Sequence, residues 1–288
     1  MKWAEIRVDT TAQAQEAVSN LMTESGCGGT VIQGEAPVSV MCYLPVDDRL
    51  EDRLLKIKEG LNKLTEFGIE PGSSDVTVRY AEDQDWAETW KQYFHTTRVG
   101  KRFVIKPSWE EYQPQPDDVV IEIDPGMAFG TGYHPTTQLC LLMLEKYMKP
   151  RKTVVDFGTG SGILAIAAAK MRASLVIAFD MDPVAVQAAR ENVVRNDVQE
   201  VMEVHQADNP RFINLQADMV IANLIADIIM TNAEAIADVL RTGGALIASG
   251  VIKERQLEVE QSLRNVGMEI VETPTEGEWV AIVARKSG

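Results

Sequence analysis

The alternation of apolar and polar residues divides the chain into two regions with different periodicity. In the first region the pattern predicts helices over Thr11–Glu24 and Leu50–Phe67, and strands at Trp3–Val8, Thr30–Ile32, Val38–Leu44 and Asp75–Tyr80. The resulting order, βαββαβ, is typical of an α+β ferredoxin-like sandwich over residues 1–81. Because this region contains no motif of chemistry-bearing residues, we expect it to serve in recognition.

Residues 82–97 are expected to form a helix that links this region to the rest of the chain. Trp86, Trp90 and Phe94 recur at helical spacing, which predicts an aromatic stripe packed against a neighbouring element. The alternative is a linker helix whose aromatic side chains also touch a substrate.

From residue 98 onward, strands alternate with helices. Strands are predicted at 153–157, Leu175–Asp180, Val201–Gln206, Ala217–Asn223 and Ala245–Ser249, and helices at 135–147, from Ile163, at Pro183–Asn196, from Asn223 through Leu240, and at Glu254–Val266. Such βα units imply a mostly parallel sheet with right-handed crossovers, so we expect an α/β domain over residues 98–288. Met268–Glu272 and Trp279–Ala284 are predicted to close the chain as an antiparallel pair.

Composition indicates a soluble globular protein of two domains, since 45% of the 288 residues are hydrophobic and 25% are charged. No apolar run approaches the roughly 20 residues that span a bilayer, and the N-terminus lacks the apolar core of a signal peptide. We therefore expect a cytoplasmic protein without membrane association. Cys27, Cys42 and Cys140 are expected to be reduced thiols, and the three scattered histidines fit no zinc-ligand spacing, so no metal is expected.

The net charge of −15 argues against broad nucleic-acid binding, because neutralising phosphates requires clustered Lys and Arg. We therefore expect no direct contact with nucleic acid. An acidic surface is compatible with a basic protein substrate, which it would attract, although many proteins are acidic for solubility alone.

A glycine turn, Asp156–Gly162, joins a β-branched strand to an alanine-rich helix. Gly158, Gly160 and Gly162 allow the backbone to approach a ligand at the positive end of that helix. The dinucleotide fingerprint is G-x-G-x-x-G, whereas here the spacing is G-x-G-x-G and Asp156 precedes it. This arrangement resembles the first motif of Rossmann-like S-adenosylmethionine (SAM) methyltransferases, in which the acid helps to hold the methionine end of the cofactor.

Polar residues follow the later strands, at the edge where ligands bind in open α/β sheets. Asp180 lies at roughly the 20-residue distance from Gly158 that is expected of an acid binding the ribose hydroxyls. Asp182 directly precedes a proline and is expected to cap the next helix, and Asp208 can either reach an adenine amine or be simply solvated. Asn223 offers an acceptor to an incoming amine and donors to a cofactor; its alternative role is a helix N-cap.

The segment Phe129–Thr137, with the sequence FGTGYHPTT, and the tetrapeptide that begins at Asn223 together resemble the PrmA-type ribosomal protein methyltransferases. The resemblance extends over Trp86–Phe94, Pro107–Trp109, Asp124–Thr137, Val154–Gly162, Asp180–Pro183 and Glu278–Arg285. In that family a ferredoxin-like N-terminal domain binds the substrate protein, and a linker helix joins it to a SAM-binding domain. The resemblance therefore implies a recognition domain over residues 1–81, a linker over 82–97 and a methyltransferase domain over 98–288.

The resemblance also implies the reaction, in which a lysine or N-terminal amine of the large-subunit ribosomal protein L11 takes the methyl group of SAM. Asn223 and the backbone carbonyls of Phe129–Gly132 are expected to orient the amine, with Phe129 or Trp109 covering the substrate chain. The alternative for both aromatic residues is a place in the core, which is favoured for Trp109. The implied cofactor contacts are Thr137, Asp156, Gly158, Gly160, Asp180 and Asn223, and the loop from Phe129 to His134 is expected near the methyl group. We expect a monomeric enzyme.

Several residues depart from the pattern of that family, among them His95, where Pro is common, and Leu224-Ile225, which reverses the usual Ile-Leu order. Thr159 stands where Cys is usual, in a turn that depends on its backbone, and should not abolish SAM binding. Tyr133 stands where a small residue is usual and bears on the substrate or the rate. The alternatives are a same-fold methyltransferase acting on another protein or a small amine, an NAD-dependent oxidoreductase, and a non-catalytic SAM-fold binding module. The glycine spacing disfavours the oxidoreductase, and the competent residues at every expected cofactor position disfavour the binding module.

Overall fold

The chain divides into two compact units, Met1–His95 and Thr96–Gly288. The computed structural model describes residues 3–27, 29–34, 38–47, 49–66, 69–73, 75–81, 94–124 and 132–288. Most of the predicted linker helix, including Trp86 and Trp90, lies outside the described residues.

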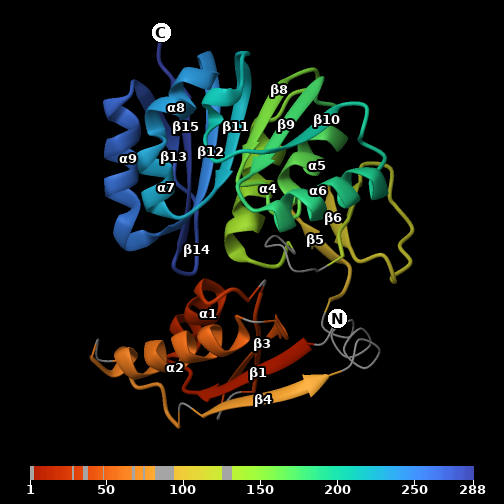
Figure 1. Ribbon diagram of the computed structural model, residues 1–288. Helices are drawn as coiled ribbons and strands as arrows, with labels where there is room; N and C mark the ends of the chain where they lie inside the picture. The colour runs from red at the N-terminus through yellow and green to blue at the C-terminus, as the bar shows by residue number, and fades with distance from the viewer. Residues whose placement is uncertain are drawn as a thin grey trace. The chain divides into compact units, whose positions relative to one another are not determined.

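The N-terminal unit combines an antiparallel sheet with two helices (Figure 1). Its elements are β1 (Trp3–Thr10), α1 (Gln15–Glu24), β2 (Val31–Gln33), β3 (Val38–Pro45), α2 (Leu50–Glu66) and β4 (Val76–Ala81). The strand order is β2-β3-β1-β4, and all three pairings are antiparallel. Val18 and Met22 of α1, and Ile57 and Leu61 of α2, are one helical turn apart and pack in the core of this unit. The order of elements agrees with the βαββαβ prediction.

The cysteines of this unit differ from the prediction of reduced thiols. Cys27 and Cys42 form a disulfide, so the prediction is wrong for this pair. Cys27 follows α1 and Cys42 lies in the central strand β3, and this packing brings their Cα atoms to 6.0 Å, within the usual range for a disulfide. Cys140, in the C-terminal unit, is free and buried.

The C-terminal unit is built around a large sheet. Its elements are β5 (Thr97–Val99), β6 (Phe103–Lys106), β7 (Val119–Glu122), α4 (Pro135–Tyr147), β8 (Thr153–Phe157), α5 (Ile163–Lys170), β9 (Leu175–Asp180), α6 (Pro183–Arg195), β10 (Met202–Gln206), η2 (Pro210–Phe212), β11 (Ala217–Asn223), α7 (Ala226–Thr231), α8 (Ala233–Val239), β12 (Leu240–Ile252), η3 (Lys253–Arg255), α9 (Gln256–Asn265), β13 (Met268–Glu272), β14 (Thr275–Glu276) and β15 (Trp279–Lys286). The main sheet has the order β10-β9-β8-β11-β12-β15-β13, with β14 paired to β15, while β5, β6 and β7 form a separate three-stranded sheet.

Strands β8 to β12 pair in parallel, and β15 pairs antiparallel with β12, β13 and β14. The predicted mostly parallel sheet with an antiparallel C-terminal pair is confirmed. The predicted single helix between Asn223 and Leu240 is wrong, because the chain forms α7 and α8 with a break at Asn232. There the Asn232 side chain donates to the Ile228 carbonyl oxygen at 2.9 Å and accepts from Asn209 Nδ2 at 2.7 Å.

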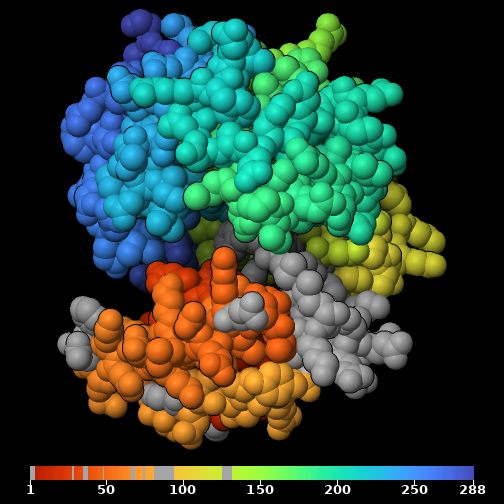
Figure 2. Space-filling model, viewed as in Figure 1, coloured from red at the N-terminus to blue at the C-terminus, as the bar shows by residue number. Residues whose placement is uncertain are grey.

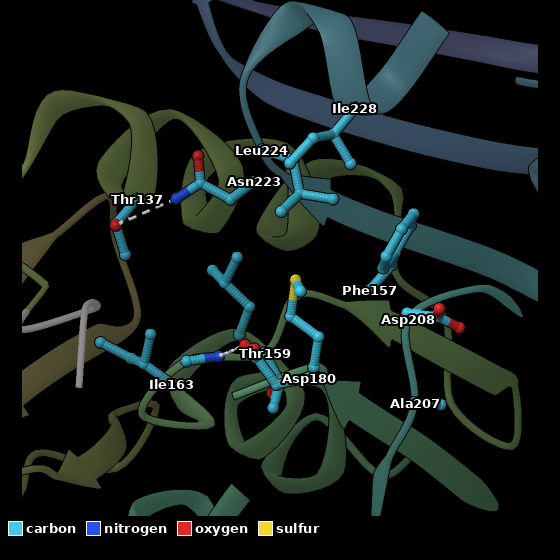
Figure 3. Close-up of a pocket in the computed structure, with 14 residues that line it drawn as sticks. Thr137, Phe157, Thr159, Ile163, Asp180, Ala207, Asp208, Asn223, Leu224 and Ile228 are labelled. Atoms are coloured by element: carbon cyan, nitrogen blue, oxygen red, sulfur yellow. Dashed lines mark hydrogen bonds between the residues drawn. The ribbon is translucent and has the colours of Figure 1, made fainter. Parts of the chain in front are cut away.

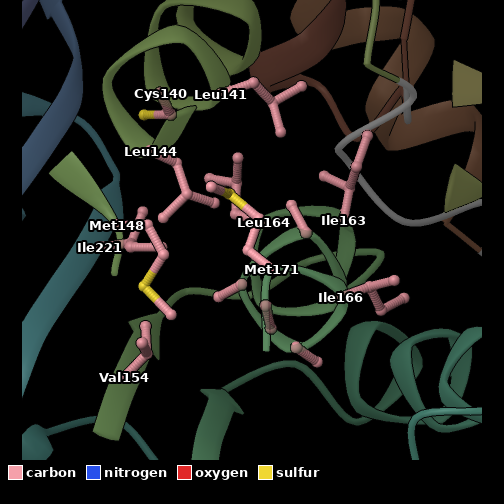
Figure 4. Close-up of a cluster of buried hydrophobic side chains, with 14 of the residues drawn as sticks. Cys140, Leu141, Leu144, Met148, Val154, Ile163, Leu164, Ile166, Met171 and Ile221 are labelled. Carbon is pink, nitrogen blue, oxygen red and sulfur yellow. The ribbon is translucent and has the colours of Figure 1, made fainter. Parts of the chain in front are cut away.

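Helices cover both faces of the main sheet (Figure 1). Successive residues of a strand point to opposite faces, and the neighbours Val154 and Val155 accordingly belong to two separate cores. In the first core, Leu144 of α4 and Leu164 of α5 pack near Ile221 of β11 (Figure 4). Residues of α7, α8 and α9 fill the second core. Burial on both faces explains the continuous apolar runs of these strands.

In the space-filling view, green and cyan side chains, which belong to α6 and the segments after it, form a continuous surface on this face of the C-terminal unit (Figure 2).

Among the helices of the described ranges, none combines the length and the apolar character that a membrane crossing requires.

Candidate functional site

A pocket lies where the strand order of the main sheet reverses. The chain continues from β8 to β9 and β10 on one side, whereas β11 and β12 lie on the other, and such a point leaves a crevice at the carboxyl ends of the strands. The pocket is lined by Thr137, Phe157, Gly158, Thr159, Gly160, Ile163, Leu164, Asp180, Met181, Ala207, Asp208, Asn223, Leu224 and Ile228 (Figure 3). The fold therefore brings together most of the residues that the sequence singles out as cofactor contacts.

The glycine turn after β8 has a backbone that other residues would strain. Gly158, Gly160 and Gly162 have φ angles of 71°, 54° and 86°, in the left-handed region that favours glycine. A Cβ atom on Gly158 would lie 2.4 Å from Leu224 Cδ2, so a side chain there would displace part of the pocket wall. The Gly158 N–H donates to the Phe179 carbonyl oxygen at 2.9 Å, which fixes the turn against β9.

Asp180, the last residue of β9, is oriented by two backbone N–H groups. Its Oδ2 accepts from the Gly160 N–H and its Oδ1 from the Asp182 N–H, each at 3.0 Å. The carboxylate is thereby held beside the glycine turn in the wall of the pocket. Asp182 itself accepts from the Val184 N–H at 2.9 Å and caps α6, as the sequence predicts.

Asn223 and Thr137 lie together at one end of the pocket (Figure 3). Asn223 Nδ2 donates to Thr137 Oγ1 at 3.4 Å, a long hydrogen bond. The alternative role of Asn223 as a helix N-cap is wrong, because the N-cap of α7 is Ile225. The site thus places an amide and a hydroxyl side by side, from β11 and from the first turn of α4.

Asp156 does not line the pocket. It is 1% exposed, and its Oδ2 accepts from Thr159 Oγ1 at 2.7 Å, beneath the glycine turn. Burial, with a smaller contribution from the nearby Asp180, raises the pKa of this carboxyl to about 7, against the lowering effect of its hydrogen bonds with Thr159 and the Ala165 backbone. The buried carboxyl is therefore hydrogen-bonded to the glycine turn through Thr159. Its contact with a cofactor stays a prediction.

An apolar wall beside the glycine turn is the part of the site that sequence reasoning missed. Phe157, Leu224 and Ile228 line it, and Phe157 stacks on Phe179 with ring centroids 4.8 Å apart. Asp208 lies at the same end of the pocket as Phe157 (Figure 3). The positions of these residues at strand ends could have indicated the wall, since Phe157 ends β8 and Leu224 follows the last residue of β11.

Phe129, the second residue predicted to act on the amine, lies outside the described residues. His134 caps α4: its Nδ1 accepts from the Thr136 N–H at 3.3 Å. Its ring packs edge-on against Trp279 with centroids 4.9 Å apart. Burial lowers the pKa of His134, which favours the neutral ring that can accept this hydrogen bond.

Known proteins match this chain over its whole length. A family model described as ribosomal protein L11 methyltransferase (PrmA) matches residues 2–287. The chain belongs to this family.

Relatives of the PrmA family agree in length as well as in sequence. The ribosomal protein L11 methyltransferase of Anoxybacillus flavithermus is 40% identical over 311 residues, covering 99% of this chain and 100% of the relative. That of Alkaliphilus oremlandii is 40% identical over 312 residues and covers all of both chains. The crystal structure of ribosomal protein L11 methylase from Lactobacillus delbrueckii subsp. bulgaricus has a TM-score of 0.64 and 33% identity, and it covers 68% of this chain and 100% of that chain.

Membership in the PrmA family confirms the resemblance drawn from Phe129–Thr137 and Asn223. It also confirms an enzyme with a Rossmann-like methyltransferase fold that uses SAM. The pocket suits such a cofactor, because it combines a fixed carboxylate at Asp180, a glycine turn that excludes side chains and an apolar wall. The roles of the individual pocket residues stay predictions.

Proposed function

We propose that this protein is a SAM-dependent N-methyltransferase that modifies lysine side chains, the N-terminal amine, or both, of ribosomal protein L11. The observation that carries the proposal is the match over residues 2–287 to a family described as ribosomal protein L11 methyltransferase. The pocket at the strand switch point supports it, because it supplies groups of the required chemistry in one place.

The cofactor would be held along the pocket from the apolar wall to Asn223. Asp180 would accept hydrogen bonds from the ribose hydroxyls, and Phe157 and Leu224 would cover the adenine, with Asp208 near its amine. The glycine turn would lie against the methionine end, where its lack of side chains permits close approach. When bound, SAM supplies an electrophilic methyl group on a sulfonium.

The residues of the chain then need only position and desolvate the acceptor amine. A lysine amine in water has a pKa of about 10.4 and must lose its proton before it attacks. Burial of the amine in the site would lower that pKa, so that a strong base is not required. We infer that Asn223 accepts a hydrogen bond from the amine and aligns it, while Phe129 covers the substrate chain.

We propose that residues 1–81 recognise the substrate protein, that 82–97 connect them to the catalytic part, and that 98–288 carry out the transfer. The net charge of −15 would attract a basic substrate protein. We further propose a monomeric, cytoplasmic enzyme that recognises its protein substrate without binding nucleic acid directly.

A methyl-transfer assay tests the substrate. Isolated ribosomal proteins would be incubated with the enzyme and SAM carrying a tritiated methyl group, and the labelled proteins separated. Label in L11 supports the proposal. Label in a different protein, or in a small amine included as competitor but not in L11, would support the alternative of a same-fold methyltransferase with another substrate.

A further inference from the structure

Two buried amides lie at the C-terminal end of α6, Asn192 in the helix and Asn196 at its C-cap. Asn192 and Asn196 are one helical turn apart and are 3% and 4% exposed. A buried amide is tolerated when its donors and acceptor are satisfied, and leucine would fill such positions without that requirement. The hydrogen-bond partners of these two side chains therefore indicate the role of the two amides.

Asn192 connects α6 to the glycine turn. Its Nδ2 donates to the carbonyl oxygen of Ser161 at 2.9 Å, between the second and third glycines of the turn. Its Oδ1 accepts from Arg195 Nη1 at 2.6 Å. The amide is thus hydrogen-bonded both to the glycine turn and to Arg195.

Asn196 connects the same helix to β7. Its Oδ1 accepts from the Glu122 N–H at 2.9 Å, and its Nδ2 donates to the Glu122 carbonyl oxygen at 2.7 Å. The side chain therefore bonds to both backbone groups of the last residue of β7, as a neighbouring strand would. This pair of hydrogen bonds fixes the end of α6 against the carboxyl end of β7.

Arg195 completes the connection at Asp124, two residues beyond the end of β7. Arg195 Nη2 lies 3.2 Å from Asp124 Oδ2, and Arg195 Nε lies 3.8 Å from Glu122 Oε1. The Asp124 carboxylate also accepts from the Ser108 N–H at 2.7 Å and from Ser108 Oγ at 2.9 Å. A continuous series of polar contacts thus runs from Ser161 through Asn192 and Arg195 to Asp124.

The chain returns to the pocket soon after Asp124. Residues 125–131 lie outside the described ranges, and at Gly132 the described chain resumes beside the site. A Cβ atom on Gly132 would lie 3.1 Å from Cδ1 of Ile163, which lines the pocket. Gly132 therefore lies against the wall of the pocket.

We propose that Asn192 and Arg195 are positioning residues: with Asp124, they hold the glycine turn of the cofactor pocket at a fixed position relative to the carboxyl end of β7. The inference rests on the proposed function, because it assigns the glycine turn to the cofactor. Because the turn lines the cofactor pocket, loss of the Arg195–Asp124 contact weakens SAM binding, and a displaced methyl donor also reduces turnover.

The test compares Arg195→Ala, Asp124→Ala and the double variant of the full-length enzyme, with SAM and L11 as substrates. Each single variant should raise the calorimetric Kd for SAM by about threefold or more and lower kcat by about tenfold or more. Because the two residues share the Arg195–Asp124 contact, the loss of activity in the double variant should be smaller than the product of the two single losses. Unchanged kcat, or losses that multiply in the double variant, would overturn the proposal.

Arg241 and Asp218 provide a matched control, because they form an ion pair at the amino ends of β12 and β11, away from the pocket. Alanine at either position should lower Tm and leave kcat unchanged. A loss of kcat in this control equal to that in Arg195→Ala would mean that general destabilisation causes both effects, and would contradict the positioning role.

Asn192 supplies a test that requires no methyl acceptor. Asn192→Asp keeps an acceptor for Arg195 but lacks the donor to Ser161, so it should release the turn and weaken SAM binding by about tenfold. Unchanged affinity for SAM would remove Asn192 from the proposal. If the wild-type enzyme binds SAM but does not methylate L11, only the proposed substrate is wrong. The SAM affinity of Asn192→Asp would then test the positioning role on its own.

Discussion

Asp180 Oδ2 accepts a hydrogen bond of 3.0 Å from the N–H of Gly160. The acid at the end of β9 is thereby oriented by the glycine turn that follows β8, although the two residues belong to different βα units. This contact joins the two parts of the sequence that most strongly indicate a nucleoside cofactor, and it lies in the wall of the pocket.

Asp180→Ala should weaken the binding of SAM by more than about tenfold, because the predicted pair of hydrogen bonds to the ribose would be lost. Isothermal titration calorimetry measures the effect directly. Asp182→Ala is the matched control: it removes the neighbouring acid, which caps α6, so it should lower stability by about 1 kcal/mol and leave SAM affinity unchanged. Wild-type affinity in Asp180→Ala would remove this residue from the site.

Asn223→Ala should lower turnover more than it lowers affinity for SAM, since the amide is proposed to align the incoming amine. Single-turnover rates and calorimetric Kd values separate the two effects. Equal losses in both quantities would identify Asn223 as a cofactor clamp, and the proposed contact with the amine would then be wrong.

Gly158→Ala should impair SAM binding and stability together. The positive φ of 71° costs about 1–2 kcal/mol for a residue with a side chain, and the new methyl group would meet Leu224 in the pocket wall. Gly277→Ala is a suitable control, because it also has a positive φ, of 55°, but a Cβ atom there meets nothing within 4 Å. Thermal unfolding with and without SAM distinguishes backbone strain, common to both variants, from pocket disruption, expected in Gly158→Ala alone.

The buried carboxyl of Asp156 predicts a pH-dependent stability. Its folded-state pKa is raised from 3.8 to about 7 by burial, so the folded state holds the proton more tightly than the unfolded state. The associated stability is fully present below about pH 4 and is lost as pH rises through 7, by up to about 4 kcal/mol. Relative to Asp156→Asn, the wild-type free energy of unfolding should therefore fall across this window, as denaturant titrations can measure. Parallel pH profiles for the two proteins would contradict the burial argument.

Local sequence signals predicted the parts of the site that depend on chain neighbours. Asp182 was recognisable as a cap because a proline follows it, and Asp180 was recognisable from its distance to the glycine turn. The strands of the main sheet were predictable because both of their faces are buried, which produces apolar runs.

Features that depend on distant contacts could not be predicted. The partners of Asn192 and Asn196 are 31 and 74 residues away in sequence, so their amides resembled ordinary helix residues. Leu224 had no sequence signal that separates a pocket wall from a core position. The disulfide between Cys27 and Cys42 likewise depends on how α1 packs on β3, which the spacing of cysteines does not reveal.

The most direct test of the central claim is the mass of purified ribosomal protein L11 after incubation with the enzyme and SAM, followed by peptide mapping. We predict added methyl groups on lysine side chains, on the N-terminal amine, or on both, and their loss when Asp180→Ala replaces the wild-type enzyme. L11 of unchanged mass, in the presence of enzyme shown by calorimetry to bind SAM, would contradict the account.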